Sequence, residues 1–315
     1  MAKQSPLQAT RSLQQDLLTM LALPTLSAWY FYGTRALLLV CISIITCVLC
    51  ELAGRKILKQ PHTVADLSAI VTGIVIALML PANAPWWMPV YGGIFAIVVA
   101  KLPFGSTEKL PFSPAAASLA FLTICFPDII FAYPKVSAAS AALASTNGVS
   151  LASMLAQNTS VSLGSVKAID IFVGNFPGAM GTGSIIVLIG SAIYMLIRRP
   201  NLSTTAAGFI AGAALMAICF PRVTNRFSSL VLELCAGYMI FAALFLITEN
   251  STQPKKPLSR LLYGASAGIA CMLMRRFGTF EECSCFAVLI INAAWPVADK
   301  ALDKFLNKNK KVKSK

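Results

Sequence analysis

Two acidic side chains interrupt long apolar stretches of this sequence, and they are the first residues that could do chemistry. Asp66 opens the stretch 64–81, and Glu233 falls early in the stretch 228–247. A carboxylate within an apolar segment is costly and marks an ion or ligand path by default. Both residues could attract a cation or accept hydrogen bonds from the polar edge of a ligand. The structural alternative is that Asp66, near the end of its stretch, reaches the membrane interface.

Other side chains that often carry catalysis are sparse. His62 is the single histidine, and most of the nine cysteines lie within apolar runs. The sequence has no Gly-rich phosphate loop with a lysine and no Gly-x-Ser-x-Gly motif. We therefore expect no catalytic residue and no metal ligand from this chain, and we expect the cysteines to act as small apolar side chains.

The composition indicates what kind of element must position Asp66 and Glu233. The 315 residues are 57% hydrophobic and only 12% charged, and the mean hydropathy is +0.73. Soluble domains carry about 25% charged residues, so a soluble globular enzyme and a disordered chain are both excluded. Apolar runs such as 36–49 and 184–197 are continuous, whereas a membrane β-barrel would alternate apolar and polar residues. The sequence predicts an all-α polytopic membrane protein.

A membrane-spanning helix needs about 20 mostly apolar residues. The sequence predicts ten such helices, at 17–33, 35–53, 64–81, 86–101, 113–131, 182–197, 204–220, 228–247, 261–274 and 284–298.

The ten predicted helices divide into two similar halves. Residues 66–69 read Asp-Leu-Ser-Ala and residues 233–236 read Glu-Leu-Cys-Ala, and the helices that follow each of them share Tyr-Gly and Phe-Gly pairs. The two copies would cross the membrane in opposite directions. We therefore predict two inverted five-helix repeats, 1–131 and 182–299, an arrangement that places a site near the middle of the bilayer. Chance similarity between apolar segments is the alternative.

The basic residues predict the orientation. With the N-terminus in the cytoplasm, nineteen of the 26 Lys and Arg residues fall on inside segments and seven on outside segments. We expect both termini to be cytoplasmic, in the cytoplasmic (inner) membrane of a bacterium. Much of the net charge of +14 lies in the tail 300–315, which is expected to fix topology and meet anionic lipid rather than nucleic acid.

Two polar segments are candidates for ligand contact. Residues 132–181 form the one long hydrophilic excursion, which this orientation places outside the cell, either as a functional loop or as a flexible linker. Residues 104–115 form a turn on the cytoplasmic side with two prolines close together, where Ser113 could hydrogen-bond a polar ligand. The alternative for this turn is a plain loop with a helix starting at Pro114.

Several motifs in register resemble the RnfD/NqrB family. They are residues 30–35 (Tyr-Phe-Tyr-Gly-Thr-Arg), 66–73 (Asp-Leu-Ser-Ala-Ile-Val-Thr-Gly), 104–105 with 111–115, 233–241 and 276–282 (Arg-Phe-Gly-Thr-Phe-Glu-Glu), followed by Phe286, Ala287, Asn292 and Ala293. The resemblance runs from about residue 17 to residue 299. Family members are integral subunits of complexes that couple electron transfer between ferredoxin and NAD, or between NADH and quinone, to movement of Na⁺ or H⁺.

The resemblance implies flavin chemistry. In the family, a flavin transferase joins FMN through its phosphate to a threonine in an extracytoplasmic motif, Asp-Gly-x-Ser/Thr-Gly-Ala-Thr. At the matching place this chain has Asn147, Gly148, Val149, Ser150, Leu151, Ala152 and Ser153. The resemblance therefore makes Ser153 the candidate acceptor for a phosphoester with FMN, with Asn147, Gly148 and Ser150 beside it. Asn147, Leu151 and Ser153 depart from the family's Asp, Gly and Thr.

Other family members also hold a noncovalent riboflavin between helices. The cytoplasmic turn, with Phe112 and Ser113, is a second candidate flavin contact, although Leu110 and Ser113 stand where the family usually has asparagine. The implied partners are the other membrane and peripheral subunits of an Rnf-type complex.

Three hypotheses stay open from the sequence. The first is a flavin-bearing redox subunit, which is part of an enzyme complex rather than an enzyme by itself. The second is a transporter or channel with the same inverted-repeat fold and no flavin. The third is a scaffold that has lost its cofactor. Fold alone does not separate them.

Overall fold

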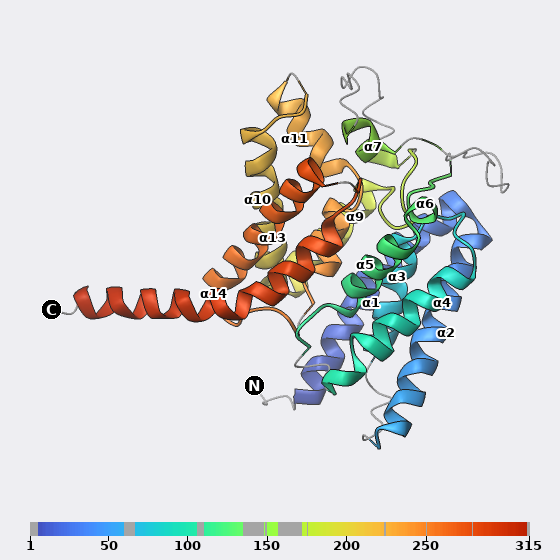
Figure 1. Ribbon diagram of the computed structural model, residues 1–315, viewed down its shortest axis with the longest axis horizontal. Helices are drawn as coiled ribbons and strands as arrows, with labels where there is room; N and C mark the ends of the chain where they lie inside the picture. Colours follow the sequence, from blue (N-terminus) through green and yellow to red (C-terminus); the bar gives the residue numbers. More distant parts are fainter. Residues whose placement is uncertain are drawn as a thin grey trace.

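The structure is a computed structural model. It describes residues 6–59, 67–105, 110–134, 148, 150–156, 172–174, 176–223, 225–249, 251–278 and 280–313. The described part is a bundle of helices without extended strands (Figure 1). This confirms the predicted all-α class.

The first half of the chain contributes helices at all five predicted stretches, although α1 begins at Pro6 rather than at 17 and α5 ends at Cys125 rather than at 131. They are α1 (Pro6–Tyr32), α2 (Thr34–Ile57), α3 (Ser68–Met79), α4 (Trp87–Ile94) continued by the π-helix η1 (Phe95–Val99), the short 3₁₀-helix η2 (Leu102–Phe104), α5 (Pro114–Cys125) and α6 (Pro127–Ile130). Pro114 is the first residue of α5, and the Ser113 side chain caps this helix by accepting from the N–H of Ala116. The predicted span 113–131 is therefore interrupted at Pro127, where α6 starts.

The second half contributes α9 (Ile185–Arg198), α10 (Pro200–Cys219), α11 (Arg226–Cys235), α12 (Met239–Phe241) continued by the π-helix η3 (Ala242–Leu246), α13 (Pro257–Phe277) and α14 (Ser284–Lys313). Between the halves lies α7 (Leu151–Ala156). A helix lies at each of the ten predicted stretches, but α14 continues well beyond residue 298. The predicted tail is therefore helical as far as Lys313.

Five helices are long and apolar enough to cross a membrane, and a sixth span results if α11 and the helix from Met239 to Leu246 count as one bent span. The shorter apolar helices α3, α5 and α9 have 12, 12 and 14 residues. Ten full-length spans are thus more than the described residues show by length alone, and of the prolines in these stretches Pro127 interrupts one, 113–131.

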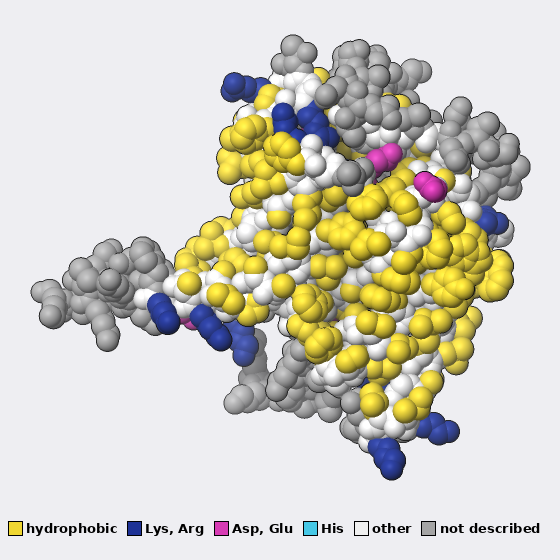
Figure 2. All heavy atoms as spheres, in the orientation of Figure 1, with side chains coloured by type: hydrophobic (Ala, Val, Ile, Leu, Met, Phe, Trp, Pro, Cys, Tyr) yellow, Lys and Arg dark blue, Asp and Glu magenta, His cyan; other side chains and the backbone are white. Residues whose placement is uncertain are grey.

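The outer surface of the bundle fits a lipid environment. Large hydrophobic side chains such as Leu49, Ile57, Leu196 and Ile197 are exposed. Figure 2 shows hydrophobic side chains across the face of the bundle, with Lys and Arg gathered toward its ends and along the extension of α14. In water such a surface would aggregate, so the chain is a multi-pass membrane protein.

Helices α10 and α13 pack more closely than side chains would permit. Gly208 and Gly212 of α10 face the backbone of α13, and Gly264 and Gly268 of α13 face the backbone of α10. A Cβ atom on Gly264 would collide with the carbonyl oxygen of Thr205, and one on Gly212 would collide with that of Ala265. Paired Gly-x-x-x-Gly motifs permit this approach in membranes, where close van der Waals contact drives helix association.

The two halves meet through helices that the predicted repeat makes equivalent. Helix α1 packs on α9, and α5 packs on α14. The Ser191 hydroxyl of α9 donates to the carbonyl of Met20 in α1 at 3.0 Å. These contacts are those expected of two halves around a shared axis, and the inverted repeat itself stays a prediction.

The end of the predicted loop 132–181 belongs to the core. The N–H groups of Met180 and Gly181 donate to the carbonyl oxygens of Leu80 and Leu78 at 3.1 and 2.7 Å. Ala179 and Met180 are fully buried. This part of the segment therefore closes the open end of α3, rather than forming a hydrophilic excursion.

Candidate functional site

The chain breaks its helix between α11 and α12. The two helical parts are bent by 64° at this point. Gly237 has a φ of 60°, a left-handed conformation, and a Cβ atom here would collide with the Glu282 carboxylate. A glycine is thus required at position 237 for two reasons: the left-handed turn and the close approach of Glu282. The break exposes backbone carbonyl groups that need partners inside the protein.

Arg275, near the end of α13, supplies those partners. Its Nη1 donates to the carbonyl oxygen of Glu233 at 3.0 Å, and its Nη2 donates to that of Ala236 at 2.9 Å. The same guanidinium contacts the carboxylates of Glu233 (3.3 Å) and Glu282 (2.7 Å). All three charged side chains are almost completely buried. One cation thus joins both sides of the helix break to the loop before α14.

A second arginine completes this cluster. Arg222 lies 3.3 Å from the other carboxylate oxygen of Glu233, and its Nη2 donates to the carbonyl oxygen of Arg275 at 2.6 Å. Burial lowers the pKa of Arg222, and the nearby Glu233 opposes that effect. We call Arg222, Glu233, Arg275 and Glu282 the arginine–glutamate cluster. Since two arginines already neutralise Glu233, this carboxylate is a structural partner rather than a free ligand for a metal cation.

Glu282 connects the cluster to a pair of tyrosines. Its second carboxylate oxygen accepts from the backbone N–H of Tyr238 at 3.3 Å. The Tyr238 hydroxyl donates to the carbonyl oxygen of Met79 at 2.9 Å and lies 3.1 Å from the Tyr133 hydroxyl. Burial raises the pKa of Glu282, although the Arg275 guanidinium opposes it, and burial also raises the pKa of Tyr133. The end of α3, the helix break and the loop before α14 therefore share one polar network.

Helix α7 sits against the same network. The Ser150 hydroxyl donates to the Glu281 carboxylate at 2.7 Å and accepts from the N–H of Ser153 at 3.0 Å, so it caps the first turn of α7. The buried side chains of α7 belong to a second apolar cluster, made of Leu151, Ala152, Leu155, Phe176, Ile185, Leu232 and Ala236. Ser153 itself is only 7% exposed. The candidate acceptor hydroxyl is therefore held inside the protein.

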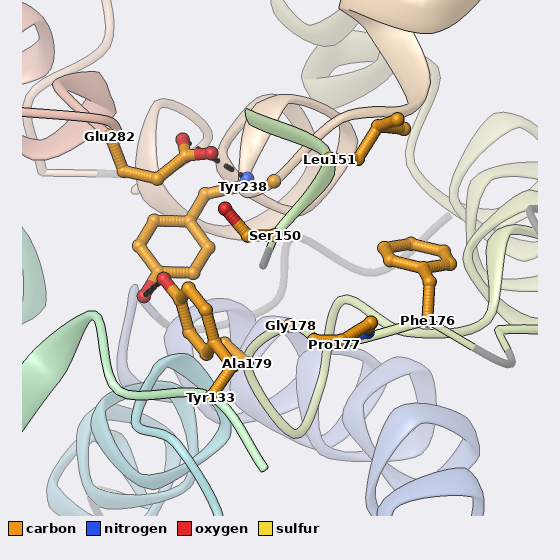
Figure 3. A pocket seen from close by; sticks show the side chains of 10 residues that line it. Tyr133, Ser150, Leu151, Phe176, Pro177, Gly178, Ala179, Tyr238 and Glu282 are labelled. Atoms are coloured by element: carbon orange, nitrogen blue, oxygen red, sulfur yellow. Dashed lines mark hydrogen bonds between the residues drawn. The ribbon is translucent and has the colours of Figure 1, made fainter. Parts of the chain in front are cut away.

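A small pocket lies between α7 and the network. Figure 3 shows Ser150, Tyr238 and Glu282 on one side of it and Phe176 and Pro177 on the other, with Ala179 beside Tyr133. It has room for about one water molecule. A flavin ring would need α7 to move before it could enter here.

The other predicted flavin residues lie elsewhere. Ser113 is buried at the start of α5. The polar network around Glu282 lies past the other end of this helix, and the 12 residues of α5 make it about 18 Å long. The Ser113 hydroxyl donates to the Glu249 carboxylate at 3.2 Å. Nearby, Tyr263 of α13 and Asn292 of α14 hydrogen-bond to each other, and an amide orientation of Asn292 that also accepts from the N–H of Ser113 satisfies all partners. Phe112 is half-buried beside them.

Two predicted residues, Asp66 and Asn147, lie outside the described residues. Gly148 is described, and its N–H donates to the carbonyl oxygen of Tyr133 at 2.8 Å. The structure thus brings Gly148, Ser150, Ser153 and Glu233 to one end of the bundle and places Phe112 and Ser113 toward the other.

The sequence interpretation missed the arginines and the role of Glu282. Arg275 closes an apolar stretch, and an ionisable residue there is a signal in its own right. It also missed a buried ion pair in which Lys101 Nζ lies 2.8 Å from the Glu51 carboxylate and 2.5 Å from the Ser68 hydroxyl.

Thiols do not form a metal centre in the described part of the chain. Cys47 and Cys50 have Cys-x-x-Cys spacing on α2, and both are free thiols. Across the described residues, no three His, Cys, Asp or Glu side chains are placed to hold a metal ion.

Comparison with known proteins covers almost the entire chain. The model of the "NQR2, RnfD, RnfE family" matches residues 4–306. The sequence is 29% identical over 296 residues to the D subunit of the Na(+)-translocating ferredoxin:NAD(+) oxidoreductase complex of Acetobacterium woodii, which covers 93% of this chain and 89% of that protein. It is 28% identical over 275 residues to the D subunit of the proton-translocating ferredoxin:NAD(+) oxidoreductase complex of Clostridium ljungdahlii, covering 85% and 83%. It is 27% identical over 323 residues to the D subunit of the ion-translocating oxidoreductase complex of Halorhodospira halophila, covering 94% and 90%.

Proposed function

The chain belongs to the NQR2, RnfD, RnfE family, and we propose that it is the RnfD-type membrane subunit of a complex that couples electron transfer to movement of Na⁺ or H⁺. The observation that carries this proposal is similarity over at least 85% of the chain to three proteins named as the D subunit of ion-translocating oxidoreductase complexes. The multi-pass helical bundle fits such a role. The remaining subunits of the complex would be its partners.

We further propose that this subunit carries FMN as a phosphoester on Ser153. Ser153 supplies the hydroxyl that the bond requires, and Ser150 fixes the turn that carries it. When bound, FMN would supply the one-electron and two-electron chemistry that the side chains of this chain lack. The protein would position the flavin, because α7 carries Ser153 and the arginine–glutamate cluster holds the helix break against which α7 packs.

Burial of Ser153 bears on when the bond could form. The residue is 7% exposed, which leaves too little of it open for a second enzyme to enclose. We propose that the flavin transferase acts while α7 is displaced from α11, with a flavin dinucleotide as the FMN donor. The Ser153 oxygen would form the bond to the FMN phosphorus as the pyrophosphate bond of the donor breaks, and the nucleoside monophosphate would leave while the serine loses its proton. Six residues make a small helix whose apolar contacts with the bundle are few, so displacement costs less than unfolding any of the long helices.

The Ser153→Ala variant tests the flavin assignment. Coexpressed with a flavin transferase, the parent chain should gain the mass of one esterified FMN and fluoresce in a denaturing gel, and Ser153→Ala should lose both signals completely. Ser184→Ala is the matched control, because Ser184 is equally buried at 7% and opens α9. Fluorescence that survives in Ser153→Ala would place the bond elsewhere, and a parent without any flavin would overturn the redox-carrier proposal.

The polar cluster around Ser113 is our proposed contact for a noncovalent riboflavin. Glu249, Tyr263 and Asn292 offer hydrogen-bonding groups beside it, and Phe112 offers an apolar face. Flavin that remains with Ser153→Ala under native conditions but is released by denaturant would support this site.

We propose that both termini face the cytoplasm and that α7 faces outward. In intact cells, a membrane-impermeant maleimide should label Ser140→Cys above the level of the parent, and it should label Lys304→Cys, on the exposed extension of α14, only after lysis. The reverse pattern would overturn this orientation, and the nine native thiols set the parent level.

One observation favours the transporter alternative. The 64° break between α11 and α12 is typical of transporters, in which unwound backbone lines an ion path. At this break, however, Arg275 already donates to the two carbonyl oxygens, and Arg222 already pairs with the Glu233 carboxylate. These contacts argue against direct binding of a cation there. Ion flux by the purified chain without any flavin would favour this alternative.

A further inference from the structure

The helix α14 does not end where its apolar span ends. Pro296 lies inside it, and the helix continues to Lys313. Figure 1 shows this part bending away from the other helices and extending sideways beyond them. A proline inside a helix removes one backbone hydrogen bond and permits such a bend. We call residues 297–313 the tail helix.

The tail helix has two chemically different sides. Its apolar residues recur at the spacing of one helix face, at positions 297, 298, 301, 302, 305 and 306. Val297 is 73% exposed, and Ala298 and Ala301 are also exposed, so the bundle does not cover this face in its described part. In the same pattern, Lys300, Lys304, Lys310 and Lys311 fall on the opposite side with Asp299 and Asp303, whereas Lys308 and Lys313 fall among the apolar positions near the end of the helix.

One contact ties the tail helix to the bundle. Asp303 forms an ion pair with Lys256, the residue that precedes α13. This places the tail helix beside the end of the bundle where α13 begins. The apolar run 284–298 leads directly into it, and its first charged residues, Asp299 and Lys300, indicate that the chain leaves the hydrocarbon there.

We propose that the tail helix lies in the plane of the membrane and binds anionic lipid headgroups. The sideways direction, the uncovered apolar face and the lysines together match a helix buried at the interface. Lysines near a membrane surface are attracted by anionic lipids, and the attraction falls off within a Debye length. This inference needs the chain to be a membrane protein but does not depend on flavin or on electron transfer.

Chymotrypsin tests the proposal on the full chain, because it can cut after Phe305, one of the apolar positions of the pattern, and does not need lysine. The purified protein is placed in nanodiscs of phosphatidylcholine alone or of phosphatidylcholine with phosphatidylglycerol. Release of the fragment after Phe305 should be roughly tenfold slower or more in the discs with phosphatidylglycerol, and high salt should remove most of this protection.

A matched pair of variants separates the tail helix from the general charge of the protein. Lys300→Gln with Lys304→Gln removes two exposed lysines of the tail helix, and Lys56→Gln with Lys59→Gln removes two exposed lysines at the end of α2. The first pair should lose most of the lipid-dependent protection, and the second pair should keep it. Equal cutting rates in the two kinds of disc would overturn the proposal. Protection that arises only when other subunits are added would overturn it too and would assign the apolar face to a protein partner.

Discussion

Arg275→Met is expected to destabilise the protein by about 3–5 kcal/mol, because it leaves the buried carboxylate of Glu282 without the cation that it contacts at 2.7 Å. Two carbonyl groups at the helix break, those of Glu233 and Ala236, would lose their donor as well. Thermal unfolding of the purified protein in detergent should show a melting temperature lower by roughly 10 °C.

The neighbouring arginine provides the control. Arg276 is exposed and donates to the carbonyl oxygen of Phe220 on the surface, so Arg276→Met should change the melting temperature by only about 1–2 °C, the order expected for roughly 0.5 kcal/mol. The double variant Arg275→Met with Glu282→Gln should recover part of the loss, since it removes the unpaired charge. Equal losses of melting temperature in Arg275→Met and Arg276→Met would show that the buried cluster does not stabilise the helix break.

Apolarity located the helices, but it did not determine their lengths. A helix lies at every predicted stretch. In a membrane protein with only 12% charged residues, a long apolar run must form a helix, because only then are its backbone N–H and C=O groups hydrogen-bonded. The interruption at Pro127 was available from the sequence, since proline begins a helix more readily than it continues one. The bend at Gly237 was less accessible, because a single glycine in an apolar helix is common and its φ depends on what packs against it.

The candidate site shows a similar division. Its acidic member, Glu233, was identifiable because charge is rare inside spans. Its partners were not, because Arg222 is 11 positions away and Arg275 is 42 positions away, and nothing in a single sequence pairs them. The interpretation of Glu233 changed with its partners, from a cation ligand to a neutralised structural group. The place of Ser153 came from resemblance alone, and its burial depends on the packing of Leu151 and Leu155 with Leu232 of α11, which are far apart in the sequence.

Gly264→Val is expected to have an effect of similar size to that of Arg275→Met. The new side chain would collide with the carbonyl oxygen of Thr205 and lie 2.9 Å from the backbone nitrogen of Phe209, and backbone atoms cannot move aside as a flexible side chain can. Helices α10 and α13 would have to separate, at a cost of about 3 kcal/mol. A lower melting temperature in detergent and a smaller yield of folded protein should follow.

Gly190→Val is the matched control, because it makes the same chemical change in another membrane helix, α9. A Cβ atom on Gly190 meets nothing closer than Leu23 Cδ1 at 3.7 Å, which is ordinary contact with the end of a side chain. This variant should therefore unfold within a few degrees of the parent, since valine has a slightly higher helix propensity than glycine. If both variants lost stability equally, the cause would be the valine side chain in any apolar helix. If only Gly264→Val lost stability, the backbone contact between α10 and α13 would be the cause, and the half of the protein that carries the arginine–glutamate cluster would depend on it.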